Sequence, residues 1–283
     1  MPLQRRHTAR TIGQRWNHLA QDLAARFQSK SESVINFVTL RMNWIAYAWL
    51  CFAGGAAILR LSGLAAASTS VTDIFAAFLL DIMLIFAPLA GFWAAAGSFP
   101  LRQKTPQPSF RLATYGRWRN IDNLEACRAP HYGPTGFLAS LIIGLMLNIP
   151  LRFLSFIVAV PAIGSHAPHW AGMIFWALAV DVGIMSFLYA SCFVMALRSI
   201  PLFPRMLAYV WSIDILTQLC IGKFLGSAHN VPVEVAGAMQ ALLSGQIDRV
   251  LISIFVWLPY LLISTRVNLT YRNRIRLARP TSL

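Results

Sequence analysis

Six long apolar runs, separated by shorter polar segments, dominate the chain. They cover residues 42–62, 74–97, 136–163, 170–197, 205–224 and 248–265. About 20 helical residues are enough to cross the hydrocarbon core of a bilayer. Because lipid offers no partners to backbone groups, a spanning segment of this kind is expected to be helical. The pattern therefore predicts an all-α fold: a polytopic membrane helical bundle with six transmembrane helices.

The segment before the first run has a different pattern. Within residues 1–41, apolar side chains recur at helical spacing, and basic side chains occupy the other faces; the apolar set is Ile12, Trp16, Leu19, Leu23 and Phe27. This pattern is typical of a basic amphipathic helix on an anionic membrane surface. Packing of the same helix on the protein's own loops is the alternative. So long a polar segment is not expected to be a cleavable signal peptide.

A second short helix is predicted between the fifth and sixth runs, over residues 225–247. Asn230 can cap it, and Pro232 suits its first turn. One face of this helix is apolar and consists of Val235, Met239, Leu242 and Leu243. We therefore expect it to lie against the outer surface of the bundle.

Composition and charge agree with a membrane protein. Apolar residues make up 57% of the 283 residues and charged residues 12%, which is more apolar surface than a soluble domain of this length can bury. Of the 24 Lys and Arg residues, 20 fall in segments on one side of the predicted topology. The positive-inside rule therefore predicts that both termini are cytoplasmic. Arg60, Lys223 and Arg249 lie near span ends on the other side.

The same distribution divides the chain and indicates its partners. The expected units are a basic cytoplasmic arm, a two-span N-terminal addition, a basic linker, a four-span unit and a basic tail, at residues 1–41, 42–97, 98–129, 130–272 and 273–283. The arm and the tail favour contact with anionic lipid headgroups. Aromatic and basic residues alternate over residues 115–119, as in some RNA-binding segments. Beside a membrane, lipid phosphates are the better partner, so nucleic acid is not expected.

Four charged residues lie inside the predicted spans at a similar depth. Asp81, Arg152, Asp181 and Asp214 fall in four different spans, on the order of 12–18 Å from the periplasmic ends at about 1.5 Å per residue. An arginine facing lipid is costly, whereas one facing carboxylates of neighbouring helices is not. We therefore predict that Arg152 pairs with Asp181, Asp214 or both, with Asp81 as a further candidate. One of the three aspartates is a candidate to hold a proton.

Two interpretations of this layer stay open. In the first, it belongs to a proton- or ion-coupled pathway, and Asn148 and Pro150 interrupt the third span beside Arg152. In the second, which we favour, it is a buried ion pair that determines which helices are neighbours. The predicted function is accordingly a non-catalytic accessory or scaffold protein of the cell envelope with a membrane-protein partner. The alternative is a small proton- or ion-coupled transporter or channel.

Motifs of other chemistries are weak. The chain has no phosphate-binding glycine loop, GxSxG elbow or HExxH helix. The residues that flank Asp181 and Asp214 do not match those of intramembrane aspartyl proteases. His166 and His169 are candidate metal ligands, but Pro168 breaks the helical spacing between them and no carboxylate or cysteine is close in sequence. No catalytic residue, metal or cofactor is predicted.

The last third of the chain carries a recognisable signature. A link contains Pro201-Leu-Phe-Pro204, and the sixth run reads Trp257-Leu-Pro-Tyr260, followed by Ser264-Thr-Arg-Val267. Residues 130 to 272 thereby resemble the bacterial inner-membrane family called domain of unknown function 2569. The resemblance implies a four-helix membrane unit in a bacterial inner membrane and no particular activity.

The signature also predicts local architecture. Pro259 cannot donate a backbone hydrogen bond and should kink the sixth span. Tyr260 and Ser264 are expected to share a helical face and to offer hydroxyls to neighbouring helices. Arg266 is expected to mark the exit into cytoplasmic headgroups.

Overall fold

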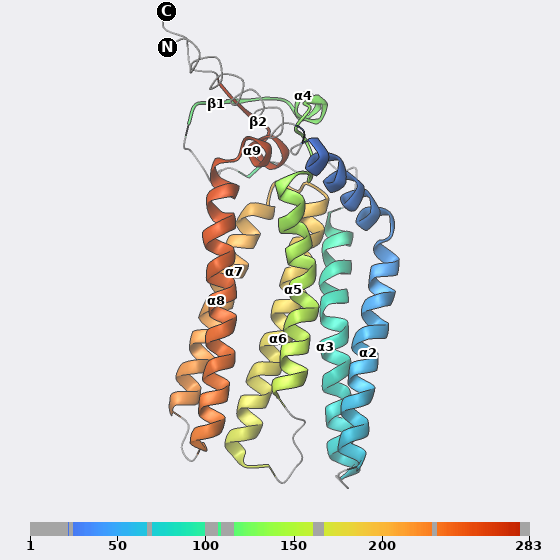
Figure 1. Ribbon diagram of the computed structural model, residues 1–283, viewed down its shortest axis with the longest axis vertical. Helices are drawn as coiled ribbons and strands as arrows, with labels where there is room; N and C mark the ends of the chain where they lie inside the picture. The colour runs from blue at the N-terminus through green and yellow to red at the C-terminus, as the bar shows by residue number, and fades with distance from the viewer. Residues whose placement is uncertain are drawn as a thin grey trace, which may run out of the picture.

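The computed structural model is a bundle of long helices that run alternately up and down, with a small cap at one end (Figure 1). It describes residue 22 and residues 25–66, 70–99, 107–108, 116–160, 167–227 and 231–277. The bundle helices are α2 (Met42–Ala66), α3 (Val71–Ser98), α5 (Phe137–Ala159), α6 (His169–Leu197), α7 (Phe203–Ser227) and α8 (Val233–Ile263). Residues 25–40 form a further helix that leads into α2.

The described part of the chain has five helices that are long and apolar enough to cross a membrane: α2, α3, α5, α6 and α8. The composition and the helix lengths are therefore those of a multi-pass membrane protein. The fifth of the six predicted spans corresponds to α7. This helix has 25 residues and lies beside the others, but Arg205, Asp214 and Lys223 make it less apolar than they are.

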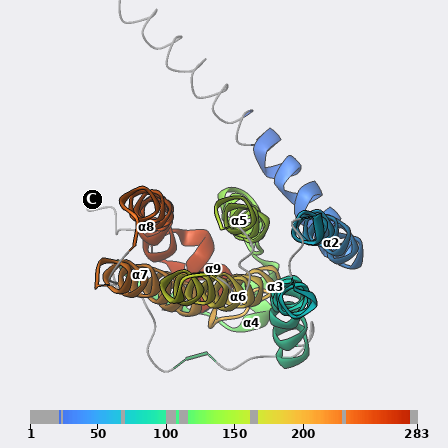
Figure 2. The ribbon, with the colours of Figure 1, turned by 90° about the horizontal axis from the view of Figure 1, so that it is seen from below.

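Seen along its long axis, the bundle consists of two rows (Figure 2). One row contains α7, α6 and α3, and the other contains α8, α5 and α2. Central α6 packs against α3, α5 and α7. Every residue from Tyr189 to Ala196 is buried. A helix that is apolar all round can face either lipid or other helices, so the central position of α6 is a result of the tertiary packing.

The tightest contact in the bundle is between α3 and α6. A Cβ atom on Gly91 would lie 2.2 Å from the carbonyl oxygen of Phe187, so the two backbones approach as closely as a glycine allows. Ser191 Oγ lies 3.1 Å from the carbonyl oxygen of Gly91 and 2.9 Å from that of Phe187. Small residues at membrane-helix interfaces permit this kind of packing.

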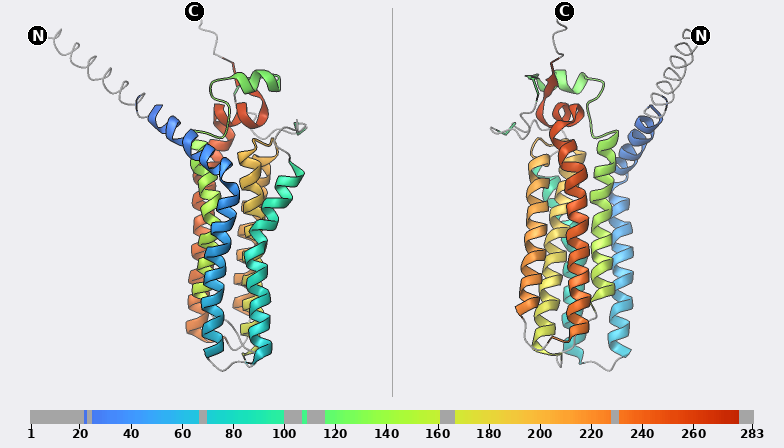
Figure 3. Two further views of the ribbon diagram at one scale, coloured as in Figure 1. Left: turned by 90° about the vertical axis from the view of Figure 1, so that its right-hand side faces the viewer. Right: turned by 60° about the vertical axis from the view of Figure 1, so that its left-hand side comes forward.

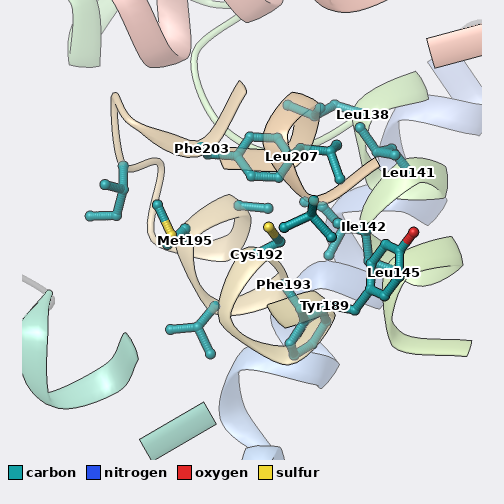
Figure 4. Close-up of a cluster of buried hydrophobic side chains, with 14 of the residues drawn as sticks. Leu138, Leu141, Ile142, Leu145, Tyr189, Cys192, Phe193, Met195, Phe203 and Leu207 are labelled. Atoms are coloured by element: carbon teal, nitrogen blue, oxygen red, sulfur yellow. The ribbon is translucent and has the colours of Figure 1, made fainter. Parts of the chain in front are cut away.

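A large apolar cluster fills the cap-end half of the bundle (Figure 4). Leu138 and Ile142 of α5 meet Cys192 of α6 and Phe203 and Leu207 of α7 there. All five side chains are almost fully buried. These contacts hold the three helices in register immediately beside the cap.

The cap joins the linker and the tail, which the sequence analysis treated as separate segments. Strand β1 (Trp118–Asn120) pairs antiparallel with β2 (Arg274–Arg276), next to the short helices α4 (Asn123–Arg128) and α9 (Thr265–Arg272). The hydroxyl of Tyr271 donates to the carbonyl oxygen of Ala196 at 2.9 Å, which ties α9 to the end of α6. The all-α prediction therefore omits this two-stranded sheet, whose two short strands carry no strand-like alternation.

Buried Arg272 links α9 to the end of α8. It donates to the carbonyl oxygen of Leu261 at 2.9 Å and to Oδ1 of Asn268 at 3.1 Å. Burial, together with nearby Arg274 and Arg205, lowers the pKa of Arg272 to about 10. The guanidinium is still charged at neutral pH, and its hydrogen bonds compensate for part of the desolvation.

The prediction of a separate short helix over residues 225–247 is wrong. Helix α8 runs without a break over 31 residues, from Val233 to Ile263, and includes most of that segment. The reason is that the sequence from Val233 to Leu258 contains glycines but no proline, and isolated glycines do not end a helix. Pro232 directly precedes the helix, and Asn230 lies outside the described residues.

The N-terminal helix slants away from the bundle at the cap end (Figure 3). Its buried residues are Ser31, Ile35 and Val38, whereas Phe27 is half exposed. Ser31 Oγ accepts a hydrogen bond from the backbone N–H of Gly136 at 2.7 Å. The described part of the arm thus packs on the protein itself. The predicted apolar residues Ile12, Trp16, Leu19 and Leu23 lie outside the described part.

Candidate functional site

The buried polar layer is a triad of Arg152, Asp181 and Asp214, contributed by α5, α6 and α7. Arg152 Nη1 lies 2.9 Å from Asp214 Oδ2, and Nη2 lies 2.8 Å from Asp214 Oδ1 and 2.7 Å from Asp181 Oδ2. The exposed fractions of the three side chains are 2%, 5% and 0%. The predicted pairing of Arg152 is confirmed, and it extends to both aspartates.

Three further side chains surround the triad. Tyr189 donates to Asp214 Oδ2 at 2.7 Å, and Gln218 Nε2 donates to Asp181 Oδ2 at 2.9 Å. The hydroxyl of Thr217 lies 3.0 Å from Asp181 Oδ1. Every group that contacts the two carboxylates can donate a hydrogen bond, which is the arrangement that two charged carboxylates need.

The sequence analysis missed these three residues, although helical spacing contains the signal for two of them. Thr217 and Gln218 follow Asp214 by three and four residues on α7, so they lie on the same face of that helix. Tyr189 follows Asp181 by eight residues, about two turns along α6. Polar residues at these offsets from an intramembrane charge are therefore candidates to belong to the same network.

Asp81 does not join the triad, contrary to the interpretation of a single layer. Its Oδ1 atom accepts from Arg60 Nη1 at 2.9 Å, and both side chains are buried. The Arg60 guanidinium also donates to the carbonyl oxygen of Val160 at 3.3 Å and lies over the rings of Phe156 and Phe175. The reason is that α2 continues to Ala66, which places Arg60 inside the bundle opposite Asp81 rather than in a link.

Two cavities border the triad. A cavity of about 10 Å³, which has room for one water molecule, is bounded by Arg152, Asp181 and Gln218. In the described part of the chain, Arg152 Nε and Gln218 Oε1 form no hydrogen bond. A larger cavity of about 270 Å³ lies between α5 and α8 and reaches Arg152 and Tyr189. Neither aspartate lines this larger cavity.

The other residues singled out on α5 lie in two different places. Asn148 lines the cavity between α5 and α8, on the same side as Arg152. Pro150 lines a separate apolar cavity of about 260 Å³ shared by α2, α3, α5 and α6. Helix α5 stays helical through Pro150, and α8 through Pro259.

Ser264 is the C-cap residue of α8 and its N–H donates to the carbonyl oxygen of Tyr260 at 3.0 Å, so the two residues keep the one-turn spacing that the sequence analysis expected. Helix α8 ends at Ile263, and Ser264 adopts an extended conformation and caps α9, where its hydroxyl accepts from the N–H of Val267 at 3.5 Å. The ring of Tyr260 packs on Phe137, with 5.0 Å between the ring centroids. Both residues of the signature therefore have architectural roles, in two different elements.

Arg266 links three segments at the cap. It donates to Oε1 of Gln28 at 2.9 Å and to the hydroxyl of Thr135. Trp257 packs on Phe137 with 4.7 Å between the ring centroids. Trp257 thus connects α8 to the start of α5, and Arg266 connects α9 to the N-terminal helix.

Two further lines of inquiry, a metal site and a comparison with known proteins, add no residue to this site. His169 is the first residue of α6, whereas His166 lies outside the described residues. The residues that the structure describes contain no cluster of three or more His, Cys, Asp or Glu side chains suited to a metal ion. Comparison of the chain with models of protein families, with curated proteins and with solved structures gave no match.

Proposed function

We propose that the protein is a non-catalytic scaffold or accessory protein of the bacterial inner membrane, with six spans and both termini in the cytoplasm. In this proposal α7 also spans the membrane, in addition to the five more apolar helices, and its Asp214 forms an ion pair with Arg152 inside the bundle. The basic arm and tail contact anionic headgroups at the cap end. The resemblance to the domain of unknown function 2569 family belongs to the same hypothesis and rests on the signature residues alone.

The observation that carries the proposal is that the side chains of the triad are buried and hydrogen-bonded. All four carboxylate oxygens of Asp181 and Asp214 have donors within 3.0 Å. A residue that carries protons or ions along a pathway needs access to water, whereas a residue that holds helices together does not. The cavity that Asp181 lines has room for one water molecule. The arrangement therefore favours a structural role.

Topology is tested with the cysteine of the cap. Cys127 is exposed on α4. In a variant that retains only Cys127, we expect a membrane-impermeant maleimide to label inverted membrane vesicles and not intact spheroplasts. Ser227→Cys in a background without other cysteines places the thiol at the opposite end of α7 and should give the reverse result. Labelling of both positions from the same side would contradict the six-span topology.

The scaffold role is tested by reconstitution into liposomes that contain a pH-sensitive dye. With an imposed proton gradient and membrane potential, we expect the same proton flux in liposomes with the protein as in liposomes without it. Asp214→Asn should leave this baseline unchanged. A flux above the baseline that Asp214→Asn abolishes would overturn the scaffold proposal.

A small proton- or ion-coupled transporter is the second candidate. The observation in its favour is the cavity between α5 and α8, which extends from the surface of the bundle to Arg152 and Tyr189. The liposome experiment separates the two candidates, because only transport predicts a flux that depends on Asp214.

A further inference from the structure

Helix α8 stands at one corner of the bundle, where its neighbours cover only part of it (Figure 2). It packs mainly on α7 and α9. Its buried residues are Leu243, Val250 and Leu261, which lie on one face of the helix. In its most apolar stretch 17% of the residues are buried, against 50% in α6. A continuous outer face of α8 is therefore left for contact with lipid or with another protein.

An acidic residue lies at the centre of this outer face. Positions 241, 244, 248, 252 and 255 follow one another by three or four residues, and all five are exposed. The middle position is Asp248, which is also the midpoint of the 31-residue helix. A hydrocarbon core of about 30 Å contains the midpoint of a helix of about 46 Å wherever along the helix it is placed. Asp248 therefore faces the hydrocarbon core and not the headgroups.

Neither Asp248 nor the adjacent Arg249 has an ionic partner within the described part of the chain. Their side chains form no salt bridge and no hydrogen bond with any residue that the structure describes. Arg249 is exposed too, and it lies at the edge of the same face, about 100° around the helix from Asp248. Charged residues inside membrane spans are costly unless they are paired. The outer face of α8 therefore needs a partner that supplies both a cation and an anion.

A second copy of the chain supplies both charges at once. Two copies inserted in the same direction can be related by a twofold axis along the membrane normal, which makes their α8 helices parallel. Across this axis the outer face meets itself, so Asp248 of each copy lies next to Arg249 of the other. One symmetric contact thus pairs all four charges. A partner of different sequence would need an acidic and a basic residue at matching positions.

The outer face also lets two helices approach closely in the half of α8 away from the cap. Gly237, Ala241 and Ser244 are small and exposed. No atom lies within 4 Å of the position that a Cβ on Gly237 would occupy. Small residues three or four positions apart are typical of contacts between membrane helices. Toward the cap, Ile252 and Phe255 are 65% and 83% exposed and add apolar area to the same face.

We infer that the protein forms a parallel homodimer through the outer face of α8, in which Asp248 of each copy pairs with Arg249 of the other. The two ion pairs carry the inference, and the small residues allow the helices to come within reach of each other. The dimer goes beyond the proposed function, because it is compatible with a scaffold and with a transporter alike. It requires only that α8 crosses the membrane.

The first test measures the oligomeric state of the full-length protein in liposomes, by single-molecule photobleaching over a range of protein-to-lipid ratios. We expect the wild type to be a dimer. Asp248→Leu should weaken the dimer at least about tenfold, because both symmetry-related ion pairs are lost. It should keep its fold, measured by circular dichroism, since Asp248 pairs with no described residue of its own chain. Glu234→Leu is the matched control: it removes the same charge from the first turn of α8 and should dimerise like the wild type.

Exchange of the charges tests the pairing itself. Asp248→Arg gives each copy two adjacent cations, and Arg249→Asp gives each copy two adjacent anions, so each variant alone should be monomeric. The two variants reconstituted together should form a mixed dimer. The double variant Asp248→Arg, Arg249→Asp should dimerise like the wild type, because the exchange keeps the face complementary to itself.

Cysteine crosslinking locates the contact in native membranes. In a background without the native cysteines, Ser244→Cys places a thiol on the outer face of α8 and should give a disulfide-linked dimer on oxidation. Leu216→Cys places a thiol on an exposed position of α7 and should leave the protein monomeric on the same treatment.

Any one of four results would overturn the inference. The first is a wild type that stays monomeric at every protein-to-lipid ratio, which would assign the outer face of α8 to lipid or to a different membrane protein. The second is a dimer of Asp248→Leu as tight as that of the wild type. The third is the absence of a mixed dimer between Asp248→Arg and Arg249→Asp. The fourth is equal crosslinking of Ser244→Cys and Leu216→Cys.

Discussion

Arg152→Leu will lower the free energy of unfolding by about 3–5 kcal/mol, the effect typical of removing one partner from a buried ion pair. The substitution leaves Asp181 and Asp214 facing each other without a cation, and both are almost fully buried. Unfolding in mixed detergent and sodium dodecyl sulfate, followed by circular dichroism, measures the change.

A matched arginine and a compensating variant make this prediction specific. Arg249→Leu removes a guanidinium that has no ion-pair partner in the described part of the chain, and its effect on stability should be below about 1 kcal/mol. The triple variant Arg152→Met, Asp181→Leu, Asp214→Leu should recover part of the loss, because replacing a whole buried ionic cluster by apolar residues is often neutral. Recovery is partial because Tyr189 and Gln218 lose their acceptors. If Arg152→Leu and Arg249→Leu had the same effect, the triad would not hold the bundle together.

Gly91→Ala will have the second largest effect, a destabilisation of about 3 kcal/mol. Its new Cβ would lie 2.2 Å from the carbonyl oxygen of Phe187, and backbone atoms cannot move aside as a flexible side chain can. Helices α3 and α6 must then separate, which also breaks the contact of Ser191 with the carbonyl oxygen of Gly91. Overpacking of a tight core costs about 1–3 kcal/mol, and this contact belongs at the upper end. The same unfolding assay measures it.

Gly97→Ala is the control on the same helix. Gly97 is exposed, and no atom lies within 4 Å of the position of its added Cβ. Because alanine is the better helix former, this change should be neutral or stabilise the protein by about 1 kcal/mol or less. Similar losses in both variants would indicate that glycine itself matters to α3, rather than the approach of α6.

Arg152 and Arg60 show how much of the site could be predicted from the sequence pattern. The similar depth of Arg152, Asp181 and Asp214 was sufficient to predict their contact, because long parallel spans place residues at matching depths side by side. The same argument failed for Asp81, because depth does not specify which helices are neighbours. Asp81 is on α3, whose neighbour α2 supplies Arg60. The single layer is replaced by the Arg152 triad and a separate ion pair of Arg60 with Asp81.

The cap shows the same limit for long-range contacts. Strand β1 and strand β2 are more than 150 residues apart in sequence, and each has only three residues. A segment that short has no hydrophobic periodicity to read. The contact of Arg266 with Gln28 likewise joins the two ends of the chain and is invisible in either segment alone.

The sequence by itself determined the helical class, the approximate limits of most long helices and the residues that could not face lipid. It could do so because apolar length and the cost of a charge in a membrane are local properties. Only the tertiary structure decided that α6 is central and that Asp81 pairs with Arg60 instead of joining the triad. It also decided that Arg249 lines the cavity between α5 and α8. These features depend on which helices are adjacent and how they are rotated, and side-chain packing between helices settles both.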